Sequence, residues 1–311
     1  MFSLNATMPV FLLMVLGYAL RRGTRLLSGG LVDGLNRFVF QMALPVQLFQ
    51  NLAQSDFHAV WDGSVVLFCF LASLLSILAM AALSLLVKER TLRGEFIQAG
   101  YRGSQALLGV ALMQNIFGST GPLPLIIIGA VPLYNVAAVV ILTLTGPGSG
   151  RLDRSTLKKT VLGIAQNPII LGILAGLAWS LLSIPQPVIF QRAVASLSAT
   201  ASPLGLIALG ASVDLKKAAG YWRPTLLCSL CKLMVFPAVF LPIAVALGYR
   251  NGLLVAVLVM LGSPTTVSCF TMAKNMGHEG LLSSGAVMLT TVCSAFSFTA
   301  WLYLLRSLAL L

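Results

Sequence analysis

The sequence predicts an all-α polytopic membrane protein with ten transmembrane helices, arranged as two five-helix repeats of opposite orientation. Three observations carry this prediction: an apolar composition, basic residues that gather on one side of the expected membrane, and a weak internal repeat. Of the 311 residues, 58% are hydrophobic and 9% are charged, whereas a soluble globular chain carries about 25% charged residues. We therefore expect a multi-pass protein of the inner (cytoplasmic) membrane.

The apolar residues fall into ten runs, each close to the roughly 20 residues that cross a bilayer as a helix. In the first run the arginines follow the apolar core, whereas a secretory signal peptide has its positive charges in front of the core. We therefore expect a retained first helix that begins outside the cell. The ten expected spans are Asn5–Leu20, Leu31–Ala53, Ser64–Val87, Gly94–Phe117, Pro122–Thr145, Thr160–Leu182, Pro187–Val213, Tyr221–Leu247, Gly252–Asn275 and Gly280–Arg306.

The basic residues of the connections set the expected orientation. Connections between consecutive spans alternate between the two sides of the membrane, and nearly all of these basic residues fall on one side. The positive-inside rule makes that side cytoplasmic. Both termini are then outside. The net charge of +12 reflects this bias, and no basic cluster is interleaved with exposed aromatic residues, so we expect no nucleic-acid partner. The cytoplasmic set is Arg21, Arg22, Arg25, Lys88, Arg90, Arg93, Arg151, Arg154, Lys158, Lys159, Lys216, Lys217, Arg223 and Lys274, and the outer set is Arg192, Arg250 and Arg306.

The two halves repeat weakly, at an offset of 158 or 159 residues. The same offset places Gly103-Ser104 on Gly262-Ser263. Five spans per half is an odd number, so the second half is inverted across the membrane, as in many secondary transporters. We expect residues 1–145 to form the first repeat, the Gly-rich segment 146–159 a cytoplasmic linker, and residues 160–311 the second repeat. The matching pairs are Pro9–Gly17 with Pro168–Gly176, and Pro45–Asp56 with Pro203–Asp214.

The run Gly262–Gly277 (GSPTTVSCFTMAKNMG) interrupts the ninth expected span. Pro264 lacks a backbone N–H and clashes with the preceding turn, so the helix is expected to kink or break there. Hydroxyl side chains flank the proline and lie beside the carbonyls that it frees. Broken helix is tolerated in a membrane where it is packed in protein or lines a cavity, and transporters often build their substrate site in this way. The alternative is an ordinary proline kink.

Three polar side chains inside the spans are candidates for substrate contacts. Lys232 lies mid-span in the eighth segment, where a cation costs about 2.5–3.5 kcal/mol on insertion scales. Arg102 precedes the glycine of the fourth span. Each cation either faces an anion or extends to the cytoplasmic face. Asn135 in the fifth span either binds substrate or packs against a neighbouring helix, and no carboxylate is expected mid-span.

Other polar groups are assigned structural roles. Gln47, Gln50, Asn51 and Gln54 form one stripe on the second span, which we interpret as a helix-packing seam in preference to a substrate contact. His278-Glu279 is interpreted as a solvated pair. Two further residues, Cys228 and Cys231, have the CxxC spacing but lack the second pair or clustered histidines of a zinc site. We expect no metal, no cofactor and no enzymatic activity, since neither HExxH nor GxSxG occurs.

Short motifs follow one another along the chain. They are ALPVQLF (Ala43–Phe49), YRGSQALLG (Tyr101–Gly109), PLYNV (Pro132–Val136), NPIILGILAGL (Asn167–Leu177), SPLGLIALGASV (Ser202–Val213), KLMVFP (Lys232–Pro237) and SPTTVSCFTMAKNMG (Ser263–Gly277). In this order they resemble the auxin efflux carrier family, which includes bacterial malonate or malate permease-like proteins. The resemblance covers essentially the whole chain.

The resemblance implies that the fourth and ninth helices break and cross at mid-membrane. It also implies a scaffold of helices one, two, six and seven, a transport domain of the others that moves in an elevator-like way, and an organic-anion substrate. Relatives often carry a Gly-hydrophobe-Pro pattern in the fourth helix, whereas here Gly109 is followed by Val-Ala-Leu. A break there must rest on Gly103 and Gly109. The long central domain of plant carriers is missing, so a small carboxylate is expected rather than auxin.

These observations predict a secondary active transporter of a small organic anion that works by elevator-like alternating access. The expected partners are the anion, a coupling ion (proton or sodium) and the lipid bilayer, while uniport or exchange and a homodimer are left open. A passive organic-anion channel and a ligand-binding membrane receptor are the alternatives. The expected substrate-binding residues are Gly103, Ser104, Gln105, Asn135, Lys232, Ser263, Pro264, Thr265 and Thr266, with Arg102 as a further anion contact.

Overall fold

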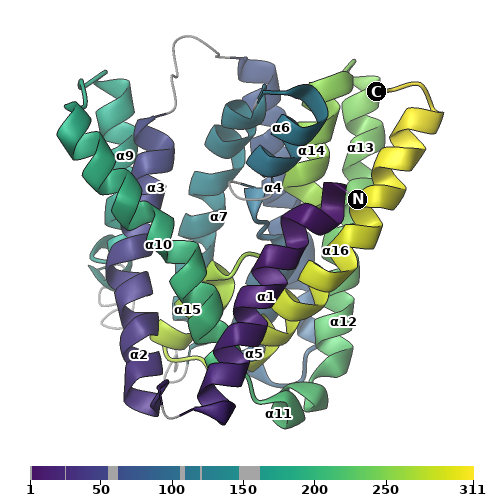
Figure 1. Cartoon of the computed structure of the whole chain (residues 1–311). Coiled ribbons are helices and arrows are strands. Elements are labelled where there is room, and N and C mark those ends of the chain that lie inside the picture. Colours follow the sequence, from purple (N-terminus) through teal and green to yellow (C-terminus); the bar gives the residue numbers. More distant parts are fainter. Residues whose placement is uncertain (1, 25, 55–61, 106–108, 120, 147–161) are drawn as a thin grey trace.

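The described part of the chain is built from helices, as the composition predicts (Figure 1). The structure is a computed structural model, and it describes residues 2–24, 26–54, 62–105, 109–119, 121–146 and 162–311. Within these residues the β-type backbone pairing consists of one isolated antiparallel bridge. The expected linker 146–159, apart from Gly146, and the repeat residue Asp56 lie outside the described residues.

Among the described residues, five helical stretches are long and apolar enough to cross a membrane. Three are single helices: α7 (Leu123–Thr145), α10 (Val188–Ser212) and α16 (Leu281–Ser307). One is α4 (Gly63–Leu83) with the short 3₁₀ turn η2 (Ser84–Leu86). The fifth is α12 (Trp222–Leu230), η4 (Cys231–Val235) and α13 (Phe236–Ala246).

The other helices are shorter or more polar. The first is α1 (Phe2–Gly23). After a short connection, α2 (Gly29–Phe38), η1 (Val39–Ala43) and α3 (Leu44–Ala53) follow one another as one continuous helical stretch. The remaining ones are α5 (Arg90–Tyr101), α6 (Val110–Phe117), α9 (Pro168–Leu181), α11 (Leu215–Gly220), α14 (Asn251–Gly262) and α15 (Ser268–Asn275).

The π-helical turns η1 and η4 each lie just before a proline. Pro45 and Pro237 have no N–H to donate to the preceding turn, and a π turn accommodates the mismatch without ending the helix. The carbonyl oxygen of Leu233, four residues before Pro237, accepts instead from the indole Nε1 of Trp301 at 3.0 Å. The helices that correspond to the expected second and eighth spans therefore each continue through the π turn without ending.

Glycines allow two pairs of helices to cross closely. A methyl group at Gly17 on α1 would meet the carbonyl oxygen of Ile207 on α10, and one at Gly176 on α9 would meet the carbonyl oxygen of Phe49 on α3. Side-chain-free positions permit this backbone approach in membrane helices. The helices α2, α3, α9 and α10 form one group, while α4, α5, α7 and α12 to α16 form another (Figure 1).

The expected fourth and ninth spans are each interrupted. The first of these spans runs as α5 up to Tyr101 and resumes as α6 at Val110, and the other runs as α14 and resumes as α15. The interruptions lie against each other, because Gly103 and Thr265 form the antiparallel bridge. The backbone N–H of Ser104 donates to the carbonyl oxygen of Pro264 at 3.0 Å. This crossing positions the candidate site.

Candidate functional site

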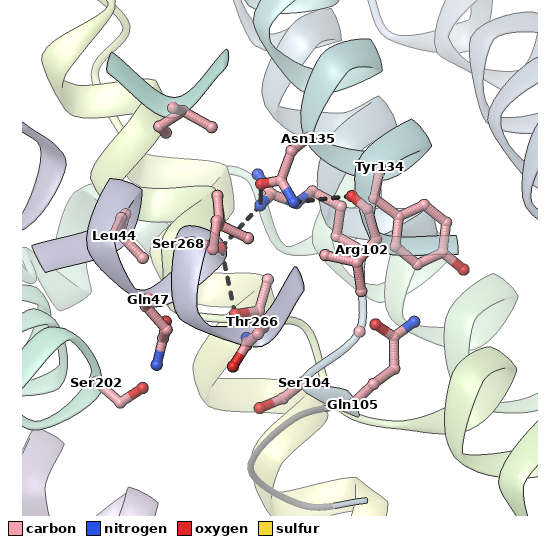
Figure 2. A pocket seen from close by; sticks show the side chains of 15 residues that line it. Leu44, Gln47, Arg102, Ser104, Gln105, Tyr134, Asn135, Ser202, Thr266 and Ser268 are labelled. Atoms are coloured by element: carbon pink, nitrogen blue, oxygen red, sulfur yellow. Dashed lines mark hydrogen bonds between the residues drawn. The ribbon is translucent and has the colours of Figure 1, made fainter. Parts of the chain in front are cut away.

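A polar cavity of about 70 Å³ lies beside the crossing, between the two helix groups (Figure 2). One wall comes from α5, α7, α15 and the segments that join the broken helices. The opposite wall comes from α3, α9 and α10. The side chains and backbone around it belong to Leu44, Gln47, Leu48, Asn51, Arg102, Gly103, Ser104, Gln105, Val131, Tyr134, Asn135, Ile169, Ser202, Thr266 and Ser268.

Arg102 is the cation of this cavity, and it is 3% exposed. Its Nη2 donates to the Oδ1 of Asn135 at 2.6 Å and to the Oγ of Ser268 at 2.9 Å. Its Nη1 contacts the Sδ of Met272 at 2.7 Å and the Oε1 of Gln98 at 3.5 Å. All these partners are neutral, and no carboxylate of the described residues pairs with Arg102. A buried cation without a counter-ion is costly, and in a membrane it is a candidate ligand site.

The neighbours of Arg102 are themselves fixed in orientation. The Nδ2 of Asn135 donates to the carbonyl oxygen of Val131 at 2.9 Å, so its Oδ1 is the atom turned towards the guanidinium. The Oγ of Ser268 also contacts the Oγ1 of Thr266 at 3.3 Å. Figure 2 shows these groups converging on one side of the cavity. Since Ser268 begins α15, the guanidinium lies at the positive end of a helix dipole, which adds to the local positive potential.

The residues that follow Arg102 bring backbone and amide groups to the cavity. Gly103 is required for the crossing, because a methyl group there would meet the Oγ of Ser263 and lie 3.0 Å from the Nζ of Lys232. Gln105 is 2% exposed, and its Nε2 has no hydrogen-bond partner among the described residues. A buried amide donor without an acceptor is unfavourable. The phenol of Tyr134, which also lines the cavity, is the neighbouring polar group of this amide.

Lys232 does not line this cavity. Its Nζ donates to the carbonyl oxygen of Tyr101 at 3.0 Å and to that of Met260 at 3.1 Å, and the side chain is 1% exposed. These carbonyls belong to the last turns of α5 and α14, where backbone acceptors lack intrahelical partners. One ammonium group thus neutralises the negative ends of both interrupted helices.

The remaining predicted residues lie on the other side of the crossing. Thr265 donates from its Oγ1 to the carbonyl oxygen of Ala99 at 2.8 Å, and its backbone N–H donates to the Oγ1 of Thr290 at 3.0 Å. Ser263 is fully buried, and its Oγ has no partner among the described residues. A second cavity of about 20 Å³ touches Pro264, Thr265 and Thr266. Thr266 lines both cavities.

Several lining residues were not among the predicted site residues. Gln47 and Asn51 belong to the polar stripe that was interpreted as a packing seam, and both face the cavity. The alignment of these polar residues on one helix face was the feature of the sequence that could have identified them as lining residues. Ser202 and Ser268 also line the cavity, and each accompanies a proline or an interruption, in SPLG and in the segment after Pro264. Tyr134 gave no signal, since an aromatic residue in an apolar span is commonplace.

The prediction that His278 is solvated is wrong. The side chain is 5% exposed, with Nδ1 at 2.9 Å from the carbonyl oxygen of Thr91 and Nε2 at 2.9 Å from that of Leu142. The ends of α5 and α7 cover the loop between α15 and α16. In the same region Glu95 is fully buried and accepts from the backbone N–H groups of Gly280 and Ser283 at the start of α16. Neither residue lines the cavity.

A multi-pass helical protein with an uncompensated cation beside two interrupted helices is, by class, a membrane transporter. Comparison with known sequences agrees. Residues 2–302 match the family described as "Membrane transport protein". The chain belongs to this family, which is that of the auxin efflux carriers, so the resemblance drawn from its motifs is confirmed.

A relative from Rhizobium meliloti (strain 1021) is named "Putative malonate transporter". It is 26% identical over 319 aligned positions, which cover 97% of this chain and 96% of the relative. Family and relative both indicate a transporter and not an enzyme.

Proposed function

We propose that the protein is a secondary transporter that carries a small carboxylate across the cytoplasmic membrane, and that Arg102 is the counter-ion of the substrate. The observation that carries this proposal is the guanidinium itself, which is 3% exposed, lines the cavity and has only neutral partners. A carboxylate bound beside the guanidinium would supply the negative charge that its neutral partners do not.

The rest of the cavity suits an anion of small size. The amide of Gln105 and the hydroxyls of Ser104 and Thr266 lie on the same wall. A volume of about 70 Å³ holds only a few water-sized groups, which favours a short carboxylate over an indole acid. The name of the Rhizobium relative adds malonate as the first substrate to test.

The proposed architecture has ten spans in two inverted five-span repeats, 1–145 and 160–311, joined by the linker 146–159. The glycine crossings support it. Gly17 on Ile207 and Gly176 on Phe49 are the same contact displaced by 159 and 158 residues, which are the offsets of the sequence repeat. Two equivalent contacts formed reciprocally by helices of different halves are what an internal twofold relation produces.

The proposed mechanism is elevator-like alternating access. Arg102, Asn135 and Ser268 come from one helix group, whereas Gln47 and Ser202 come from the other (Figure 2). Asn51 of α3 lines the same wall as Gln47. A cavity at such an interface opens when one group moves relative to the other. We place α1, α2, α3, α9 and α10 in the scaffold and both termini outside.

The test is transport by the purified protein in proteoliposomes. Malonate, malate and an indole acid are applied on solid-supported membranes, and counterflow of labelled malonate is measured in parallel. A carrier shows saturable flux and counterflow, whereas a channel shows no counterflow and a receptor shows no flux.

Arg102→Gln is the decisive variant. We expect malonate counterflow to fall at least about 100-fold, because the positive charge that faces the anion is lost. Malonate-induced thermal stabilisation in detergent should disappear in the same variant. Arg192→Gln removes an exposed arginine of α10 and serves as the control for total charge. Equal counterflow in Arg102→Gln and in the unsubstituted protein would remove Arg102 from the site.

A further inference from the structure

We propose that a cleft at the cytoplasmic end of the protein binds an anionic phospholipid. The cleft has a volume of about 430 Å³ and lies between the start of α5 and the start of α12. Its rim carries Lys88, Glu89 and Arg223, and its floor includes Val87, Leu92 and Leu227. This site is separate from the cavity at the crossing, and the inference does not depend on the proposed substrate.

The position of the cleft along the helices corresponds to the headgroup region of a bilayer. Two of the membrane-crossing stretches, Gly63–Leu86 and Trp222–Ala246, have their ends beside it. Leu86 is 71% exposed and Trp222 57% exposed at these ends. An exposed tryptophan at the end of a membrane-crossing helix is typical of the level where lipid tails meet headgroups. In Figure 1 this end carries α11 and the beginning of α12, opposite to the C-terminus.

The rim of the cleft carries more positive charge than negative charge. Lys88 and Arg223 are both exposed, and neither forms an ion pair with a described residue. Arg223 instead lies over the ring of Trp222, 5.4 Å from its centroid. The carboxylate of Glu89 accepts from the hydroxyl of Tyr221 at 3.3 Å, and the two cations of the lining exceed this one acid. A phosphodiester is the anion that a lysine and an arginine at headgroup depth recognise.

The floor of the cleft distinguishes a lipid from a free anion. Val87 and Leu92 are buried side chains, and Leu227 is half-buried beside them. Inorganic phosphate gains nothing from an apolar floor, whereas the glycerol backbone and the first methylenes of an acyl chain do. The central segment 146–159 is a poor alternative occupant, because its sequence GPGSGRLDRSTLKK is itself basic. Like charges would meet at the rim.

A lipid in this cleft would join two elements that hold the crossing. Its cations come from the η2–α5 connection and from α12, while α5 ends at Tyr101 and α12 leads into η4 with Lys232. The carbonyl oxygen of Tyr101 is one of the two that Lys232 caps. The bound lipid is thus expected to raise the thermal stability of the detergent-purified protein.

The test measures the rise in melting temperature of the delipidated full-length protein during titration with phosphatidylglycerol in detergent. We expect Lys88→Gln/Arg223→Gln to weaken this apparent affinity by about tenfold or more. The matched control is Lys216→Gln/Lys217→Gln, which removes the same charge from the neighbouring helix α11, outside the cleft lining. Size-exclusion profiles and lipid-free melting temperatures check that both double variants fold.

Three outcomes would overturn the proposal. An equal loss in the two double variants would reduce the effect to general surface charge. Competition by millimolar inorganic phosphate would assign the site to a free anion. Equal stabilisation by phosphatidylcholine would remove the headgroup from recognition. A loss confined to the Lys88/Arg223 variant, together with a weaker response in Leu227→Gln, establishes both the rim and the floor of the site.

Discussion

The two interruptions that meet at the crossing differ in chemistry and in use. The interruption after α14 has the stronger sequence signal, with Pro264 and three hydroxyl residues. Of these hydroxyl residues only Thr266 lines the main cavity: Thr265 bonds to Ala99 and Thr290, and Ser263 is buried away from the cavity. The interruption after α5 lacks the family's proline, yet it supplies Arg102 and Gln105 to the cavity.

The comparison separates what breaks a helix from what binds a ligand. A proline interrupts a helix through covalent structure alone, so the second interruption needs no partner to form. The first needs its neighbours: Gly103 lets the backbones touch, and Lys232 caps the carbonyl oxygen that the end of α5 leaves unpaired. The segment held by packing is the one that carries the charge of the site.

Gly103→Ala is expected to have the largest effect on stability among the substitutions at the crossing. The added methyl group would meet Ser263 and the Nζ of Lys232, and overpacking of this kind costs up to about 3 kcal/mol. Transport should be lost with it. The measurement is the melting temperature in detergent alongside malonate counterflow. Gly163→Ala, where a methyl group meets no described atom within 4 Å, is the control, and equal melting of both variants would contradict the role given to Gly103.

Lys232→Met should lower stability by about 2 kcal/mol while leaving malonate affinity nearly unchanged. The methionine keeps much of the apolar stem but leaves the carbonyls of Tyr101 and Met260 without their shared donor. Thermal melting and malonate-induced stabilisation separate the two effects. If affinity falls as it does in Arg102→Gln while stability is kept, Lys232 contacts the substrate, as the sequence alone suggested.

The sequence carries most of the fold because apolar runs and the proline are local signals. The five apolar stretches long enough to cross a membrane each agree with an expected span to within one residue, and the interruption at Pro264 was predicted from one residue and its neighbours. The contacts of Lys232 were not predictable in this way, since its two carbonyl partners lie 131 and 28 residues away in sequence. His278 was misjudged for the same reason: the carbonyls that enclose it are 187 and 136 residues distant. From the sequence alone a polar residue in a loop is expected to be solvated, because the distant helix ends that bury it are known only from the fold.

Thr265→Val and Thr266→Val form a matched pair on the second interruption. Thr265 bonds to Ala99 and Thr290 and does not line the main cavity, so its loss should cost about 1 kcal/mol of stability and leave the KM for malonate unchanged. Thr266 lines the cavity, so its loss should raise KM by about threefold to tenfold with little change in stability. KM from counterflow and thermal melting are measured for both. The reverse pattern would exchange the roles of the two threonines.

Pro264→Ala is expected to have the smallest effect on stability, below about 1 kcal/mol, and a larger effect on transport. The new N–H at position 264 can reach back to the carbonyl oxygen of Met260, the acceptor that a proline leaves free. That acceptor already receives the Nζ of Lys232. A carbonyl oxygen has two lone pairs, so both donors can be accommodated, and the bridge between Gly103 and Thr265 holds the second interruption open.

What changes is the freedom of α14 to extend by a turn when the helix groups move. Counterflow that falls while the melting temperature is kept would show that the proline acts on motion, and a melting temperature that falls as far as in Gly103→Ala would show that the crossing rests on the proline after all.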